Sequence, residues 1–98
     1  MNVTNALKQP GLDKRGFFAL IHDDTGRVYT SVTANIRLGI IETMDQLKAG
    51  KHPNSKLQRF YNSSPNFQVV TQVSSDGMRG AKKDERSFCS TISSYLTI

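Results

Sequence analysis

The sequence has only one cysteine, no long apolar run and no internal repeat. The first two of these features each argue against a class of protein. Cys89 alone cannot form an internal disulfide, which argues against a disulfide-stapled secreted scaffold. No apolar run approaches the ~20 residues that a membrane-spanning helix needs. The first residues also lack the basic and then apolar layout of a secretory signal. We therefore expect a cytoplasmic protein with no membrane partner.

The residues that are present suit one small domain with a basic surface. The chain has 98 residues, of which 37% are hydrophobic and 21% charged, and its formal net charge is +5. Such an excess of cations permits a polyanionic partner without requiring one. Residues 1–15 are polar and broken by Pro10 and Gly11, so we expect an extended or partly ordered N-terminal arm there. Residues 16–98 are expected to form a single domain.

Two short runs around a turn predict a β-hairpin at the start of this domain. Residues 16–22 are almost wholly apolar, and residues 27–31 favour β-structure. Residues 23–26, with the sequence DDTG, form a strong turn signal between them. Because the first run is apolar on both faces, we expect it to be the central strand of the sheet.

The hydrophobic period changes to that of a helix over residues 33–47, where apolar residues recur every three or four positions. Thr33 or Asn35 is expected to cap the start of this helix, and Gly50 lies just past its end. A second, short helix is expected directly after Asn54, which occupies a typical N-cap position.

The rest of the chain predicts one more strand and one more helix. Residues 67–73 alternate as a strand, and residues from about 81 onward form a helix in this interpretation. The expected apolar positions are Phe67, Val69 and Val73 on the strand, and Phe88, Ile92, Tyr95 and Leu96 on the helix. The order β-β-α-α-β-α predicts a small α+β domain, with helices flanking a three-stranded antiparallel sheet.

Residues 47–62, with the sequence LKAGKHPNSKLQRFYN, carry the most specific motif of the chain. This run is similar to the Leu-x-x-Gly-x-His-x-Asn-x-x-Leu-Gln segment of homing-type GIY-YIG nucleases, which phages and mobile introns encode. The resemblance covers about residues 16–96, in the same order of elements. It implies the GIY-YIG fold and, for an active member, Mg²⁺-dependent hydrolysis of a phosphodiester.

The name-giving motifs of that family are altered in this sequence. Phe18 stands where the family has the tyrosine of Gly-Ile-Tyr, and Tyr29 begins a Tyr-Thr-Ser run in place of Tyr-Ile-Gly. We expect Phe18 and Tyr29 to share one face of the sheet. The position of the catalytic arginine is Gly39, and Arg37 would point roughly 200° away from it on a helix.

The resemblance implies roles for the remaining candidates. Tyr29 would act as base or orienting group, His52 matches a family histidine, and Arg37 is a relocated candidate for the missing cation. Glu85, three residues before Phe88, matches the metal-binding glutamate, and Mg²⁺ prefers such a carboxylate together with waters. Mg²⁺ is expected only if the protein is active, and no cofactor otherwise.

Each candidate also has an ordinary structural interpretation. Tyr29 suits a half-buried strand residue, His52 a loop residue between helices, and Glu85 the charged first turn of the last helix. His22, beside the predicted turn, is expected to be solvated. Cys89 is expected to be a small buried residue rather than a nucleophile.

The basic residues give the better signal for function, because lysine and arginine bind phosphates with strongly salt-dependent affinity. The candidates for nucleic-acid binding are Arg27, Lys48, Lys51, Lys56, Arg59, Lys82 and Lys83. The alternative is that these cations are scattered and only keep the domain soluble.

The leading hypothesis is therefore a degenerate GIY-YIG endonuclease-like domain from a phage or mobile-element context, catalytically impaired and acting by binding DNA or RNA. Losing an electrostatic catalytic group typically costs ~10²–10³ in rate. One alternative is a phage-type protein-binding module that inhibits or redirects a host or partner protein. Another is an active metal-dependent endonuclease that uses Tyr29, Arg37 and Glu85.

Overall fold

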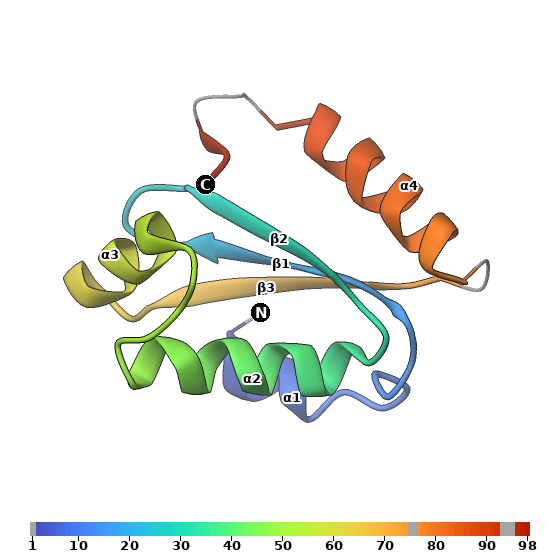
Figure 1. The fold of residues 1–98 in the computed structure, drawn as a ribbon, viewed down its shortest axis with the longest axis horizontal. Coiled ribbons are helices and arrows are strands. Elements are labelled where there is room, and N and C mark those ends of the chain that lie inside the picture. The colour runs from blue at the N-terminus through green and yellow to red at the C-terminus, as the bar shows by residue number, and fades with distance from the viewer. Residues whose placement is uncertain (1, 75–76, 93–95) are drawn as a thin grey trace.

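A three-stranded antiparallel sheet lies at the centre of the fold (Figure 1). The structure is a computed structural model, and it describes residues 2–74, 77–92 and 96–98. The strands are β1 (Gly16–His22), β2 (Val28–Thr33) and β3 (Phe67–Val73), in the spatial order β2-β1-β3. The prediction that the apolar first strand is central is confirmed.

In the part of the chain that the structure describes, four helices lie around the sheet: α1 (Val3–Leu7), α2 (Ile36–Lys48), α3 (Ser55–Ser63) and α4 (Gly77–Ser90). Figure 1 shows α1 and α2 on one side of the sheet and α4 on the other. Successive side chains of β1 point to opposite sides of the sheet. Phe17 contacts Phe88 of α4, while Phe18 packs in the core with Ile36 and Ile40 of α2. The predicted α+β class with an antiparallel sheet is confirmed.

The residues that the sequence indicated as caps of α2 and α3 make the expected contacts. The Asn35 side chain accepts a hydrogen bond from the Leu38 amide at 3.0 Å, and that of Asn54 accepts one from the Leu57 amide at 3.1 Å. Gly50 follows α2 with a φ of 72°, a conformation that favours glycine at a helix C-terminus. Gly50 and the Asn54 cap therefore lie at the two ends of the connector between α2 and α3.

The first fifteen residues, expected as an extended or partly ordered arm, contain a helix and contribute to the core. Ala6 of α1 and Leu12 are both buried in the main hydrophobic cluster. The backbone carbonyls of Leu12 and Lys14 accept hydrogen bonds from the first amides of α2, at 3.1 and 3.0 Å. Those amides have no partner inside their own helix, so the segment satisfies groups that would otherwise need water.

The prediction for the last helix is wrong at both ends. Helix α4 begins at Gly77 rather than near residue 81, and it ends at Ser90, so Ile92 and Leu96 lie beyond it. Tyr95 lies outside the described residues. The Ser90 and Thr91 hydroxyls donate to carbonyls three residues earlier, which competes with continuation of a helix.

His22 is fully buried, so the expectation that it is solvated is wrong. Its imidazole nitrogens lie 2.9 Å from the Thr25 hydroxyl and 3.0 Å from the Ser64 carbonyl. The rings of Phe60 and Phe67 pack against it, with centroids 5.4 and 5.1 Å away. His22 therefore ties the hairpin loop to the end of α3.

Candidate functional site

Tyr29 lies on the outer strand β2, on the sheet face that carries Phe18. Tyr29 is paired with Leu20 and Phe18 with Ser31 in the β1–β2 register, so the expected shared face is confirmed. Burial raises the pKa of the half-buried Tyr29 phenol above its ordinary value. A hydrogen bond with the Ser31 side chain opposes this rise in pKa, and the charge of Glu85 adds to it.

His52 meets Tyr29 from the connector between α2 and α3. The two rings are edge to face, with centroids 5.5 Å apart and planes at 88°. The Asn54 amide donates to Nδ1 of His52 at 3.0 Å, which leaves the proton of a neutral imidazole on Nε2. Partial burial lowers the pKa of His52 below its ordinary value, so the neutral form is favoured.

Two of the predicted site residues therefore come together, Tyr29 from β2 and His52 from the connector. Glu85 belongs to α4, on the other side of the sheet from α2 (Figure 1), and acts on Tyr29 only through its charge. Within the described residues, no group of three or more His, Cys, Asp or Glu side chains could hold a metal ion. Glu85 supplies one carboxylate, whereas protein Mg²⁺ sites use one or two together with substrate phosphates.

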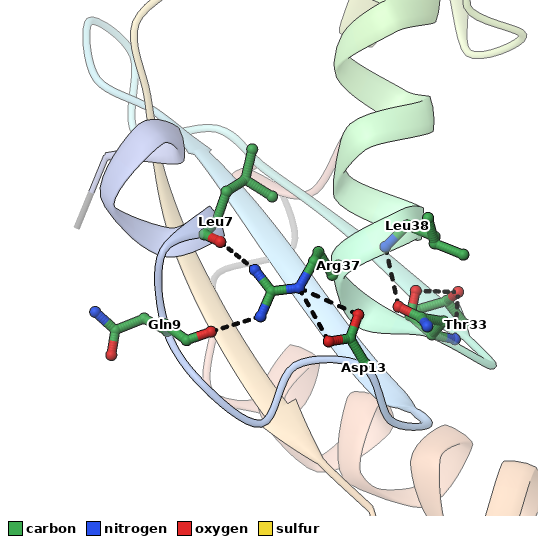
Figure 2. Close-up of polar contacts among 7 residues, drawn as sticks. Leu7, Gln9, Asp13, Thr33, Arg37 and Leu38 are labelled. Carbon is green, nitrogen blue, oxygen red and sulfur yellow. Dashed lines mark hydrogen bonds and ion pairs between the residues drawn. The ribbon is translucent and has the colours of Figure 1, made fainter.

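Arg37 is held away from this group, against the N-terminal segment (Figure 2). Its Nη1 donates to the Leu7 carbonyl and its Nη2 to the Gln9 carbonyl at 2.7 Å. Its Nε forms an ion pair with the Asp13 carboxylate at 3.1 Å. Arg37 thus binds the end of α1 and the chain that follows it, and its guanidinium donors are directed to these groups.

Gly39, where the resemblance expects an arginine, packs directly on Phe18. A Cβ at this position would lie 3.0 Å from Cε1 of Phe18 and 3.1 Å from both Oγ1 and Cγ2 of Thr33. Such distances are tighter than ordinary van der Waals contact, and the Phe18 ring is itself fully buried. A side chain at position 39 would therefore require Phe18 or Thr33 to shift by a few tenths of an ångström.

Three of the predicted nucleic-acid-binding residues line one pocket at the end of the sheet where β2 begins. We call it the α3 pocket; it encloses about 520 Å³ and is lined by Arg27, Lys56, Arg59, Phe60, Ser63, Thr97 and Ile98. The guanidinium of Arg27 lies over the Phe60 ring, 5.7 Å from its centroid. Figure 1 shows α3 and the C-terminus at this end of the sheet.

The other four predicted cations lie outside the α3 pocket. Lys48 lines a separate cavity of about 590 Å³, which Asp23 and Asp45 also line. Lys51 is exposed in the connector next to His52, and the exposed lysines of α4 are Lys82 and Lys83. The predicted set therefore divides into one concentrated group and several separate cations.

The sequence analysis did not predict three residues of the candidate site: Phe60 and Ser63 in the α3 pocket, and Ser31 beside Tyr29. The α3 residues of the pocket are Lys56, Arg59, Phe60 and Ser63, which recur at i, i+3, i+4 and i+7 and so share one face of the helix. That spacing is visible in the sequence and could have identified the face. Ser31 could not be identified in this way, because its contact with Tyr29 depends on both side chains lying on one face of strand β2.

No family model matches the chain, and neither the curated proteins nor the solved structures include a match. Among the described residues, none of the helices is both long and apolar enough to cross a membrane.

Proposed function

We propose that this chain is a nucleic-acid-binding domain related to GIY-YIG nucleases, with little or no cleavage activity. The observation that carries the proposal is the group of three cations around the α3 pocket: Arg27, Lys56 and Arg59. Arginine and lysine side chains gathered in one place are suited to the phosphates of DNA or RNA. Arg27, which lines the pocket, is two residues from Tyr29 in the chain.

Impaired cleavage follows from the groups that the site lacks. Phe18 has no hydroxyl to handle a proton, and Gly39 offers no cation to a growing phosphate charge. Arg37, the relocated candidate, is bound to Asp13 and to two backbone carbonyls. Tyr29 and His52 remain in contact, but they lack the electrostatic partner that phosphoryl chemistry needs.

Binding and cleavage are measured on the same oligonucleotides, single- and double-stranded DNA and RNA, at low salt with Mg²⁺ or Mn²⁺. We expect a shift in fluorescence anisotropy that weakens as salt rises, with no cleavage products. The double variant Lys56→Ala/Arg59→Ala should bind more weakly. The matched control is Lys8→Ala/Lys14→Ala, which removes the same charge from exposed positions of the N-terminal segment.

Two results contradict this proposal in different ways. Cleavage that disappears in Glu85→Ala would show an active metal-dependent endonuclease. Absence of binding to every nucleic acid at low salt would contradict the binding function. That second result would favour the protein-binding module. Two exposed apolar side chains of α2 support this alternative: Leu38 is 53% exposed, and Ile41, one turn later, is 37% exposed.

A further inference from the structure

The α3 pocket concentrates positive side-chain charge without an acidic side chain in its lining. Lys56 and Arg59 project from one face of α3, and Arg27 comes from the end of the hairpin loop. Cations spread along a groove follow a nucleic-acid backbone, with about one contact for each phosphate. Three cations around one pocket instead favour a single group of high negative charge.

We propose that the α3 pocket binds a terminal phosphomonoester of a single-stranded DNA or RNA chain, an inference that rests on the nucleic-acid-binding function proposed above. A phosphodiester within a chain carries one negative charge, whereas a phosphomonoester carries about −1.5 to −2 at pH 7. It also presents three acceptor oxygens, which suit the forked donors of Arg59 and the point charge of Lys56, while Arg27 adds positive charge beside them.

The walls of the pocket also suit a chain end. A continuous backbone must both enter and leave its site, which is easiest in an open groove. Here the last residues close one side, since Thr97 pairs with Val28 and the Ile98 amide donates to the Val28 carbonyl at 2.8 Å. The volume of about 520 Å³ exceeds that of a phosphate alone, and Phe60 and Ile98 offer apolar surface to the terminal sugar and base.

The test compares oligonucleotides of one sequence that carry a 5′-phosphate, a 3′-phosphate or only hydroxyl ends. Affinities are measured by competition at fixed salt, with a protein that has no tag after Ile98, because that residue lines the pocket. We expect one phosphorylated end to bind about 10–100-fold more tightly than the hydroxyl ends, the gain expected from additional charge-assisted hydrogen bonds. The end whose phosphate increases the affinity of the oligonucleotide is the terminus that the pocket recognises.

Variants then locate the effect. Lys56→Ala/Arg59→Ala should remove the preference for the phosphorylated end, and Lys8→Ala/Lys14→Ala should keep it. Equal affinity of the wild type for phosphorylated and hydroxyl ends would overturn this inference while leaving general nucleic-acid binding intact. A preference that survives in Lys56→Ala/Arg59→Ala would also overturn it, and no binding to any oligonucleotide would overturn both proposals.

Discussion

Phe18 and Gly39 are packed against each other, since a Cβ on Gly39 would lie 3.0 Å from Cε1 of Phe18. These are the two positions at which the resemblance to GIY-YIG nucleases expects a catalytic tyrosine and a catalytic arginine. Helix α2 therefore lies against the sheet where an active member would need a polar side chain. The two departures from the family pattern fit one another as parts of the same packed core.

Replacing Gly39 by arginine should destabilise the protein. The side chain would push against Phe18 and Thr33, and overpacking of this kind typically costs about 1–3 kcal/mol in the free energy of unfolding. Gly39→Ala should cost less, because alanine regains about 1 kcal/mol of helix propensity. Urea denaturation measures both variants, and a Gly39→Arg protein as stable as the wild type would show that the helix yields easily.

Removing the side chain of Arg37 should loosen the N-terminal segment rather than alter nucleic-acid binding. Arg37→Ala loses the bonds to the Leu7 and Gln9 carbonyls and to Asp13, for an expected cost of about 1–3 kcal/mol. Asp13→Asn is the smaller change, because the exposed ion pair contributes at most about 1 kcal/mol.

Hydrogen exchange gives the local readout for this prediction. The Ala6 amide, which donates to the Asn2 carbonyl at 2.9 Å, should exchange faster in Arg37→Ala while the amides of β1 change little. If Arg37→Ala instead keeps Ala6 protected and weakens oligonucleotide binding, Arg37 belongs to the binding site.

The Tyr29 phenol should titrate above its ordinary pKa of 10 because burial disfavours the phenolate. The folded state then binds the phenol proton more tightly than the unfolded state does. The contribution of the protonated phenol to the free energy of unfolding is therefore present below pH 10. That contribution is lost as pH rises through the higher pKa of the folded state. Ultraviolet titration against Tyr29→Phe isolates the signal. Glu85→Gln should lower the pKa of Tyr29, and an unchanged pKa would show that Glu85 is too distant to act on it.

The His52 imidazole should titrate below its ordinary pKa of 6.5, because partial burial disfavours its charged form. The unfolded state then binds a proton more readily, so stability is present above pH 6.5 and is lost as pH falls through the lower pKa of the folded state. NMR titration of the ring protons measures the pKa of His52, with His52→Gln as assignment control. A pKa at or above 6.5 would show that the ring is solvated.

The sequence predicted those elements whose signals are local. The strands Gly16–His22 and Phe67–Val73 have the predicted bounds, and Asn54 caps α3 as its position indicated. Caps and turns depend on residues three or four positions apart, so a single sequence displays them. Helix α1 was not predicted although Asn2 caps its start, because five residues are too few to be stable alone and depend on contacts made by Arg37.

Long-range contacts decided what the sequence could not show about the candidate site. His22 is buried because its imidazole reaches the Ser64 carbonyl, 42 residues later in the chain. The approach of α2 to Phe18 and the enclosure of the α3 pocket by Thr97 likewise join distant segments. The resemblance singled out both Tyr29 and His52, whose rings are in contact, but it gave no indication of the groups that Arg37 binds.

The dependence of oligonucleotide affinity on salt tests the central claim most directly. For a single strand, the slope of log K against log salt concentration changes by about 0.7 for each phosphate contact. We predict that the wild type has a clear negative slope, and that Lys56→Ala/Arg59→Ala reduces its magnitude by about 0.7, the value for one phosphate, while Lys8→Ala/Lys14→Ala leaves it unchanged. Equal slopes for the wild type and Lys56→Ala/Arg59→Ala would contradict a phosphate-binding role for the α3 pocket.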